Sequence, residues 1–135
     1  VIDARVFRDP AERDLYVLDI DPALRFAIDR AHLYQILDNL LANARRYCTG
    51  AAAAVHLQAV LLAGERIALH VRDDGPGLDA AQRRHLFEPF FTSHAKGTGL
   101  GLYIARELAE ANDATLELAA STCGADFVLT GRQRP

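Results

Sequence analysis

The chain has 135 residues, of which 50% are hydrophobic and 24% charged, and its formal net charge is −3. These values predict one globular domain spanning residues 1–135, and they exclude a two-domain protein and the strongly basic surface typical of nucleic-acid binding. No apolar run reaches the length of about eighteen residues that a membrane span needs, so we expect none.

Short apolar runs near the beginning of the chain predict strands. Two runs, Ala4–Phe7 and Leu15–Ile20, flank the turn-forming pair Asp9-Pro10. A brief extended piece is expected at Arg25–Ile28.

The hydrophobic pattern changes between Arg30 and Tyr47 to that of an amphipathic helix. Its apolar stripe consists of Leu33, Ile36, Leu37, Leu40, Leu41 and Ala44. Asp29 stands at the position of an N-cap, and Gly50 is the expected stop.

Two strands and a short helix are predicted next. The runs Val55–Leu62 and Ile67–Asp73 alternate in polarity on either side of residues 63–66, which predicts a hairpin. A turn at residues 75–77 precedes a short helix at Ala80–Leu86.

The last part of the chain is predicted to hold a polar, mobile loop at Thr92–Thr98, a helix at Gly99–Ala111, and strands at Thr115–Ala119 and Ala125–Thr130. Helices and hairpins do not alternate strictly as βαβ units. This order predicts an α/β two-layer sandwich, with helices on one face of a mixed sheet, rather than a doubly wound parallel sheet.

Asp73 is the first residue whose position suggests chemistry. It has the strand parity of Leu69 and Val71, so its carboxylate is expected to face the buried side of the strand. A buried carboxylate needs hydrogen-bond donors, and the amino group of a purine would supply one. The alternative is that Asp73 ends its strand in solvent.

Three polar residues share one face of the first helix. Asn39 and Asn43 are four residues apart, and Arg46 follows three residues later. Amide oxygens suit Mg²⁺, and a guanidinium suits a phosphate. The alternative is an ordinary solvated helix face.

A glycine-rich run, Gly97–Leu102, opens the later helix. Glycines at a helix start expose backbone N–H groups, and the helix dipole favours an anion there. A polar loop precedes the run, so it is not a Rossmann fingerprint, and no P-loop pattern is present. With Asp73 and the polar face of the first helix, it predicts a nucleotide site built from three parts of the chain.

Four motifs in order make the chain resemble the catalytic ATP-binding domain of bacterial sensor histidine kinases, in the superfamily that includes gyrase, Hsp90 and MutL. The N box resembles His32–Tyr47, the G1 box Asp73–Leu78, the F box Leu86–Phe91 and the G2 box Gly97–Leu102. The resemblance implies the Bergerat ATP-binding fold, a mixed sheet of about five strands with about three helices on one face. The sequence from Tyr103 to Leu108 resembles the nitrogen-regulation and type IV pilus sensor branch.

The resemblance also implies a role for individual residues. Asn43 would ligate Mg²⁺, and Asp73 would accept from the adenine amino group. The implied catalytic residues are Asn39, Asn43, Arg46 and Lys96, the last as the candidate for the γ-phosphate. The implied nucleotide-binding residues are Asn43, Arg46, Tyr47, Asp73, Gly75, Gly77, Leu78, Phe91, Thr98, Gly99, Leu100, Gly101 and Leu102. Phe87 and Phe91 would anchor the loop that covers the nucleotide.

Some positions depart from the family pattern. Asp74 stands where asparagine is usual, which adds negative charge near the site, and no arginine directly follows the F box. The histidines are predicted to be structural or at the surface, so the acceptor histidine of such kinases is expected on a separate dimerisation domain.

The implied function is binding of Mg-ATP and donation of its γ-phosphate to that acceptor histidine, with a response regulator downstream and little activity expected from this domain alone. A degenerate nucleotide-binding or interaction module and a serine kinase of the anti-sigma-factor type are the alternatives. The implied location is the cytoplasm, with a parent kinase anchored in the inner membrane.

Cys48 and Cys123 lack a CxxC spacing and are expected to be free thiols of a reducing compartment.

Overall fold

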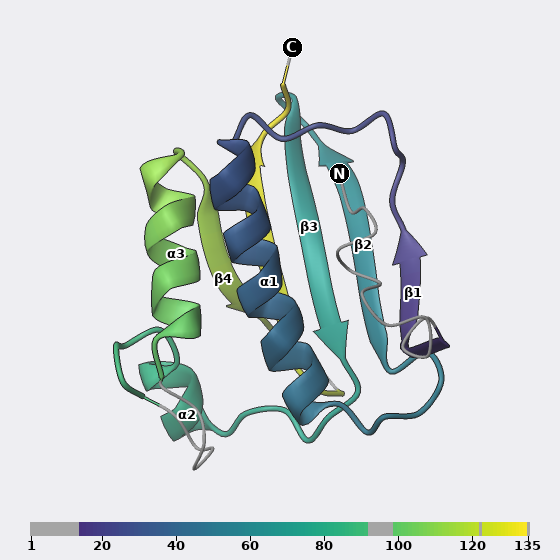
Figure 1. Cartoon of the computed structure of the whole chain (residues 1–135), viewed down its shortest axis with the longest axis vertical. Helices are drawn as coiled ribbons and strands as arrows, with labels where there is room; N and C mark the ends of the chain where they lie inside the picture. Colours follow the sequence, from purple (N-terminus) through teal and green to yellow (C-terminus); the bar gives the residue numbers. More distant parts are fainter. Residues whose placement is uncertain (1–13, 92–98, 122, 135) are drawn as a thin grey trace.

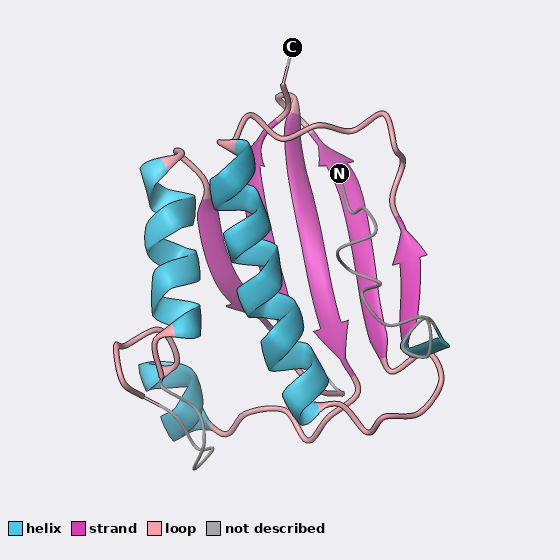
Figure 2. Cartoon of the chain, viewed as in Figure 1, coloured by secondary structure: helices cyan, strands magenta, loops and turns pink. Residues whose placement is uncertain are grey.

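The computed structural model describes residues 14–91, 99–121 and 123–134. The predicted strand at Ala4–Phe7 and the predicted loop at Thr92–Thr98 lie outside these residues. Within them, a sheet forms one layer and helices cover one of its faces (Figures 1 and 2), so the predicted two-layer α/β sandwich is confirmed.

The sheet has five strands in the described part of the chain, in the order β1-β2-β3-β5-β4. The strand β1 pairs with β2 in parallel, whereas the other three pairings are antiparallel, so the sheet is mixed as predicted. The strands are β1 (Tyr16–Asp19), β2 (Val55–Leu62), β3 (Arg66–Asp73), β4 (Thr115–Ala119) and β5 (Asp126–Arg132). Strand β5 begins one residue later and ends two residues later than expected, because it continues to pair with β3 as far as Arg132.

The hairpin between β2 and β3 sets the register of the sheet. Its turn contains Gly64 and Glu65, both with positive φ, at 74° and 58°. Pairing then runs from Leu62 with Arg66 to Val55 with Asp73. Asp73 is thereby placed at the end of β3 farthest from the turn.

Helix α1 (Arg30–Tyr47) lies over the sheet and has the predicted bounds. The carboxylate of Asp29 accepts a hydrogen bond from the backbone N–H of His32 at 3.0 Å, which confirms the predicted N-cap. The predicted apolar stripe packs on the sheet, and its fully or nearly fully buried members are Ile36, Leu37, Leu40, Leu41 and Ala44.

The predicted bounds of α1 hold, but Gly50 is not the residue that stops it. The helix ends at Tyr47, and its C-cap is Cys48, whose backbone is extended although its N–H still donates to the carbonyl of Ala44. The chain leaves the helix there because the next residue, Thr49, hydrogen-bonds to Asp74 at the end of β3. This contact joins residues 25 positions apart, which local sequence does not predict.

The other two described helices are α2 (Ala80–His85) and α3 (Gly101–Ala111). Helix α2 begins at the capping box of Asp79 and Gln82. Helix α3 begins two residues later than predicted, because Gly99 has a φ of 73° and its carbonyl accepts from the N–H of Phe90.

Helices α1 and α3 lie side by side and are joined at one end by Asn112 (Figure 1). The Asn112 side chain accepts from the N–H of Asp29 at 2.9 Å and lies 2.9 Å from Nδ1 of His32. It also donates to the carbonyl of Leu108. The start of α1 is thus attached to the end of α3.

The hydrophobic core lies between the helices and the sheet. Its largest fully buried side chains include Phe127, Leu116 and Leu129 of the two last strands. The extended piece predicted at Arg25–Ile28 is reduced to a single bridge between Phe26 and Gln133. In residues 14–91, 99–121 and 123–134, no helix has the length and apolar character needed to cross a bilayer.

Candidate functional site

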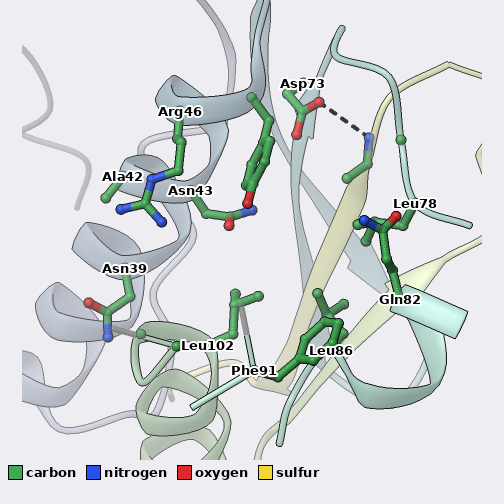
Figure 3. Close-up of a pocket in the computed structure, with 15 residues that line it drawn as sticks. Asn39, Ala42, Asn43, Arg46, Asp73, Leu78, Gln82, Leu86, Phe91 and Leu102 are labelled. Atoms are coloured by element: carbon green, nitrogen blue, oxygen red, sulfur yellow. Dashed lines mark hydrogen bonds between the residues drawn. The ribbon is translucent and has the colours of Figure 1, made fainter. Parts of the chain in front are cut away.

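A cavity of about 250 Å³ opens between α1, the end of β3, α2 and the start of α3 (Figure 3). Most of the residues proposed from sequence meet there. The cavity is lined by Asn39, Ala42, Asn43, Arg46, Tyr47, Asp73, Gly77, Leu78, Gln82, Leu86, Phe91, Gly99, Gly101, Leu102 and Ala125.

One wall of the cavity is the polar face of α1. The spacing of four and three residues aligns Asn39, Asn43 and Arg46 along this wall, as predicted (Figure 3). The oxygen of the Asn39 amide accepts from Gln35 at 3.3 Å, but its nitrogen Nδ2 is buried and has no hydrogen-bond partner among the described residues. An unsatisfied buried donor is costly, so it marks a position where a ligand acceptor would be stabilised.

Asp73 lies at another end of the cavity and is only 6% exposed. Its Oδ1 accepts from the N–H groups of Gly75 at 2.9 Å and Ala125 at 3.4 Å, the latter drawn as a dashed line in Figure 3. Within the described residues its Oδ2 receives no hydrogen bond. The predicted buried orientation is therefore confirmed, and one carboxylate oxygen remains available for a ligand.

Burial raises the pKa of the Asp73 carboxyl above its ordinary value. The hydrogen bonds from Gly75 and Ala125 oppose this rise, and the negative charge of Asp74 adds to it. The protein thus holds a carboxylate in surroundings that disfavour its charge, which is typical of ligand sites.

Asp74 does not line the cavity. Its two carboxylate oxygens accept from the N–H of Thr49 at 2.8 Å and from the hydroxyl of Thr49 at 2.6 Å. The side-chain hydrogen bond first, and then the backbone one, lower the pKa of Asp74. The unusual acid of the G1 box therefore fastens the loop after α1 to the end of β3.

Gly75 and Gly77 have different surroundings. Gly77 lines the cavity, whereas Gly75 does not. A Cβ on Gly75 would collide with the carbonyl oxygen of Tyr47, so this glycine allows the end of α1 to approach the β3 loop. Of the two glycines proposed from sequence as nucleotide-binding residues, Gly77 therefore lies at the cavity and Gly75 lies behind its wall.

The start of α3 closes a third side. Gly99 and Gly101 line the cavity, but Leu100 between them does not. In the described part of the chain, no side-chain hydrogen bond caps this helix start, where the N-cap residue is Leu100. Asn39 of α1 faces Gly101, since a Cβ on that glycine would lie 3.9 Å from the Asn39 Cγ. The unsatisfied Asn39 amide and the uncapped helix start therefore adjoin the same space.

The two phenylalanines proposed as anchors differ in position. Phe91 lines the cavity. Phe87 instead packs edge-on against the core residue Phe127, with ring centroids 6.1 Å apart, and lies beneath the guanidinium of Arg106. Lys96 and Thr98, proposed from sequence, lie outside the described residues.

Four lining residues escaped the sequence analysis: Ala42, Gln82, Leu86 and Ala125. The motif Asp79-x-x-Gln82 predicts a capping box, but nothing in the sequence places its helix against the cavity. Ala125, the residue before β5, reaches the site because its carbonyl accepts from the N–H of Asp73 at 3.0 Å.

The described histidines lie outside the cavity lining. His32 contacts Asn112, His70 lies 3.0 Å from the carboxylate of Asp126 on the open face of the sheet, and His85 contacts Glu88. These contacts support structural roles for all three.

Comparison with known protein families gives one match over most of the chain. Residues 28–134 match the family described as histidine kinase-, DNA gyrase B- and HSP90-like ATPase.

Curated relatives include two bacterial sensors. The sensor protein kinase PilS of Pseudomonas aeruginosa is 43% identical over 93 residues, which cover 67% of this chain and 18% of PilS. The sensor protein RstB of Escherichia coli is 38% identical over 104 residues, which cover 73% of this chain and 23% of RstB. The chain thus spans about a fifth of the length of these relatives.

Solved structures share the fold over nearly the whole chain. The mycobacterial sensor histidine kinase MprB has a TM-score of 0.80 at 24% identity, over 97% of this chain and 91% of that one. Full-length ShkA, solved in complex with AMPPNP, has a TM-score of 0.75 at 27% identity, over 96% of this chain and 28% of ShkA.

Proposed function

The chain belongs to the histidine kinase-, DNA gyrase B- and HSP90-like ATPase family, as the ATPase domain of a two-component sensor histidine kinase, and on this premise we propose that it binds Mg-ATP in the described cavity. It donates the γ-phosphate to an acceptor histidine on a separate domain of a longer kinase, which then passes it to a response regulator.

The observation that carries this proposal is the meeting of Asp73 with the polar face of α1 and the start of α3 in one cavity. The free Oδ2 of Asp73 accepts a hydrogen bond from the adenine amino group. The apolar side chains of Leu78, Leu86 and Phe91 provide surfaces for the purine ring.

The phosphates lie toward the opposite side of the cavity. Arg46 supplies positive charge, and the buried Nδ2 of Asn39 donates to a phosphate oxygen. The uncapped start of α3 at Gly99 and Gly101 favours an anion through its backbone N–H groups and its dipole.

The cavity also fits a magnesium ion. Asn43 extends from the α1 wall toward the cavity and offers an amide oxygen (Figure 3). Mg²⁺ prefers oxygen ligands and takes most of them from substrate phosphates and water, so one protein ligand suffices. The ion would neutralise charge on the phosphates, while Asn39 and Arg46 orient them.

Phosphoryl transfer asks a protein mainly for positioning and charge neutralisation. The four described histidines lie outside the cavity lining, and three of them, His32, His70 and His85, are engaged by Asn112, Asp126 and Glu88. This supports an acceptor histidine on another domain, and it leads us to expect little turnover from this domain alone.

Calorimetric titration of Mg-ATP and Mg-ADP tests the proposal. The wild-type domain should bind both with a Kd on the order of micromolar. Asp73→Ala should abolish binding, and Asn43→Ala should make it weaker and insensitive to Mg²⁺. Glu117→Ala, which removes an exposed carboxylate of β4, is the control and should bind normally. A folded wild-type domain that binds neither nucleotide would instead identify an interaction module.

A further inference from the structure

Gln82 lines the cavity but belongs to none of the four sequence motifs. It is the third residue after Asp79, the N-cap of α2, and the two residues form a reciprocal pair. The N–H of Gln82 donates to Oδ1 of Asp79 at 2.8 Å, and the N–H of Asp79 donates to Oε1 of Gln82 at 3.0 Å.

This pairing decides which way the Gln82 amide points. A backbone N–H can only donate, so the atom that it meets must be the amide oxygen. The amide nitrogen Nε2 is consequently turned away from Asp79. In Figure 3, Nε2 is the amide atom of Gln82 that points toward Asn43 across the cavity. Within the described residues no acceptor is recorded for Nε2.

The neighbours of Gln82 indicate which part of a ligand it would meet. It lies beside Leu78 and Leu86, on the wall opposite α1 (Figure 3). Asn39 and Arg46, which suit phosphates, lie on the α1 wall. The Gln82 donor therefore faces the part of the cavity where the nucleoside is expected.

We propose that Gln82 is a nucleoside-binding residue, whose Nε2 donates a hydrogen bond to an acceptor on the base or the ribose of the bound nucleotide. This inference rests on the proposed function. Asp73 offers an acceptor and Gln82 a donor, so the two residues together recognise a nucleoside through hydrogen bonds at two of its atoms. The capping box already holds the Gln82 side chain, so little rotamer entropy is lost on binding.

The capping box allows a clean test. Gln82→Glu keeps an oxygen for the N–H of Asp79, because glutamate serves the same box, but it lacks the donor. Gln82→Met removes the donor without adding charge. Ala81→Glu adds the same charge at a neighbouring exposed residue that does not line the cavity. Affinities for adenosine and for Mg-ADP are measured by titration calorimetry, and melting temperatures are measured without ligand.

The proposal predicts that Gln82→Glu weakens adenosine and Mg-ADP alike by about three- to tenfold, with an unchanged melting temperature. Gln82→Met should weaken adenosine similarly, whereas Ala81→Glu should leave adenosine affinity unchanged. Normal adenosine affinity in both Gln82 variants would overturn the proposal. A loss confined to Mg-ADP and matched by Ala81→Glu would also overturn it, because that pattern reports charge repulsion.

Ligand analogues identify the acceptor. Adenosines lacking ring nitrogen N1, N3 or N7, or the ribose 2′-hydroxyl, are compared on the wild type and on Gln82→Glu. One analogue should bind the wild type more weakly than adenosine does yet lose no further affinity in the variant. If every analogue loses as much in the variant as adenosine does, Gln82 has no acceptor on the nucleoside. A wild type that binds no nucleotide would refute the proposed function itself, an outcome distinct from a binding wild type that is insensitive to Gln82.

Discussion

Asp74 receives two hydrogen bonds from Thr49, one from the backbone N–H at 2.8 Å and one from the hydroxyl at 2.6 Å. The pair connects the residue after the α1 C-cap with the end of β3. We expect Asp74→Ala to lower the melting temperature more than Thr49→Val does. The first change removes both short hydrogen bonds from Thr49, whereas the second removes one of them and a longer, exposed one that the hydroxyl accepts from the N–H of Ala51 at 3.3 Å. Asp74 does not line the cavity, so Mg-ADP affinity of the folded variants should stay within about threefold of wild type. A tenfold loss in Asp74→Ala with a normal melting temperature would show that this carboxylate acts on the ligand instead.

Asp73→Asn should reverse the preference between adenine and a 6-oxo purine. The oxygen of the new amide would take the place of Oδ1, where the N–H groups of Gly75 and Ala125 require an acceptor. The amide nitrogen would then face the base as a donor. We predict that the variant loses affinity for ATP by tenfold or more and gains relative affinity for inosine triphosphate, at a cost of about 1–3 kcal/mol to adenine recognition. Competition between the two nucleotides gives the ratio, and an unchanged ratio would contradict this orientation of Asp73.

Adenosine binding should weaken on acidification, and it should do so at a higher pH than if the aspartate had an ordinary pKa. Burial raises the pKa of Asp73 above 3.8, and only its charged form is a full acceptor for the amino group. Binding should therefore fall as pH decreases through that raised pKa, and Asp73→Asn should show no such step. Adenosine is preferred to ATP because phosphates also titrate. A titration midpoint at or below 3.8 would contradict the burial argument.

The stability of the ligand-free protein should depend on pH in the opposite sense. A carboxyl whose pKa is raised by folding binds its proton more tightly in the native state, so stability from Asp73 declines as pH rises from 3.8 through the raised pKa. Asp74, with a lowered pKa, loses its contribution only as pH falls below 3.8 through that lowered value. Between 3.8 and the raised pKa of Asp73, Asp73→Asn should therefore flatten the pH dependence of the melting temperature.

Gly124→Ala should be far more damaging than Gly64→Ala, although both glycines have positive φ, at 67° and 74°. A Cβ on Gly124 would collide with the carbonyl oxygen of Asp73, whereas one on Gly64 would meet nothing within 4 Å. We expect about 1 kcal/mol of destabilisation for Gly64→Ala, from backbone strain alone, and several kcal/mol for Gly124→Ala. Urea unfolding measures both, and equal losses would mean that the contact with Asp73 is unimportant.

Asn39→Leu should separate stability from binding. The change removes a buried donor for which residues 14–91, 99–121 and 123–134 offer no partner, and it replaces the amide with an apolar group of similar shape. The free energy of unfolding without ligand should be unchanged or rise by about 1 kcal/mol, whereas Mg-ATP affinity should fall at least tenfold. Adenosine affinity is the internal control and should be retained, because Asn39 lies on the phosphate side. A variant that loses stability and keeps Mg-ATP affinity would refute the role given to Asn39.

The sequence predicted the elements whose limits are local. Helix α1 was predicted residue by residue because Asp29 caps it and its apolar stripe is long and regular. Features that depend on distant partners were predicted less well. The start of α3, which depends on the hydrogen bond between Phe90 and Gly99, was misplaced by two residues, and the stop of α1 was assigned to Gly50 rather than to the contact of Thr49 with Asp74.

The candidate site divides in the same way. Helical spacing and strand parity placed Asn39, Asn43 and Asp73 at the cavity, because those rules fix which residues share a face. Gln82 and Ala125 reach the cavity only through the packing of α2 and β5 against other elements. The hydrophobic pattern within neither segment indicates that packing.

The attachment of α1 to α3 by Asn112 lies at the end of the helices away from the cavity (Figure 1). In mechanical terms Asn112 is a joint between the two helices, and Asn39 and Gly101 face each other on the cavity side of that joint. Moving Asn39 and Gly101 apart then requires rotation of the helices about Asn112 or bending of one helix, rather than sliding of α3 away from α1. The gap that the phosphates would enter is thereby given a preferred width by a side chain that never touches them.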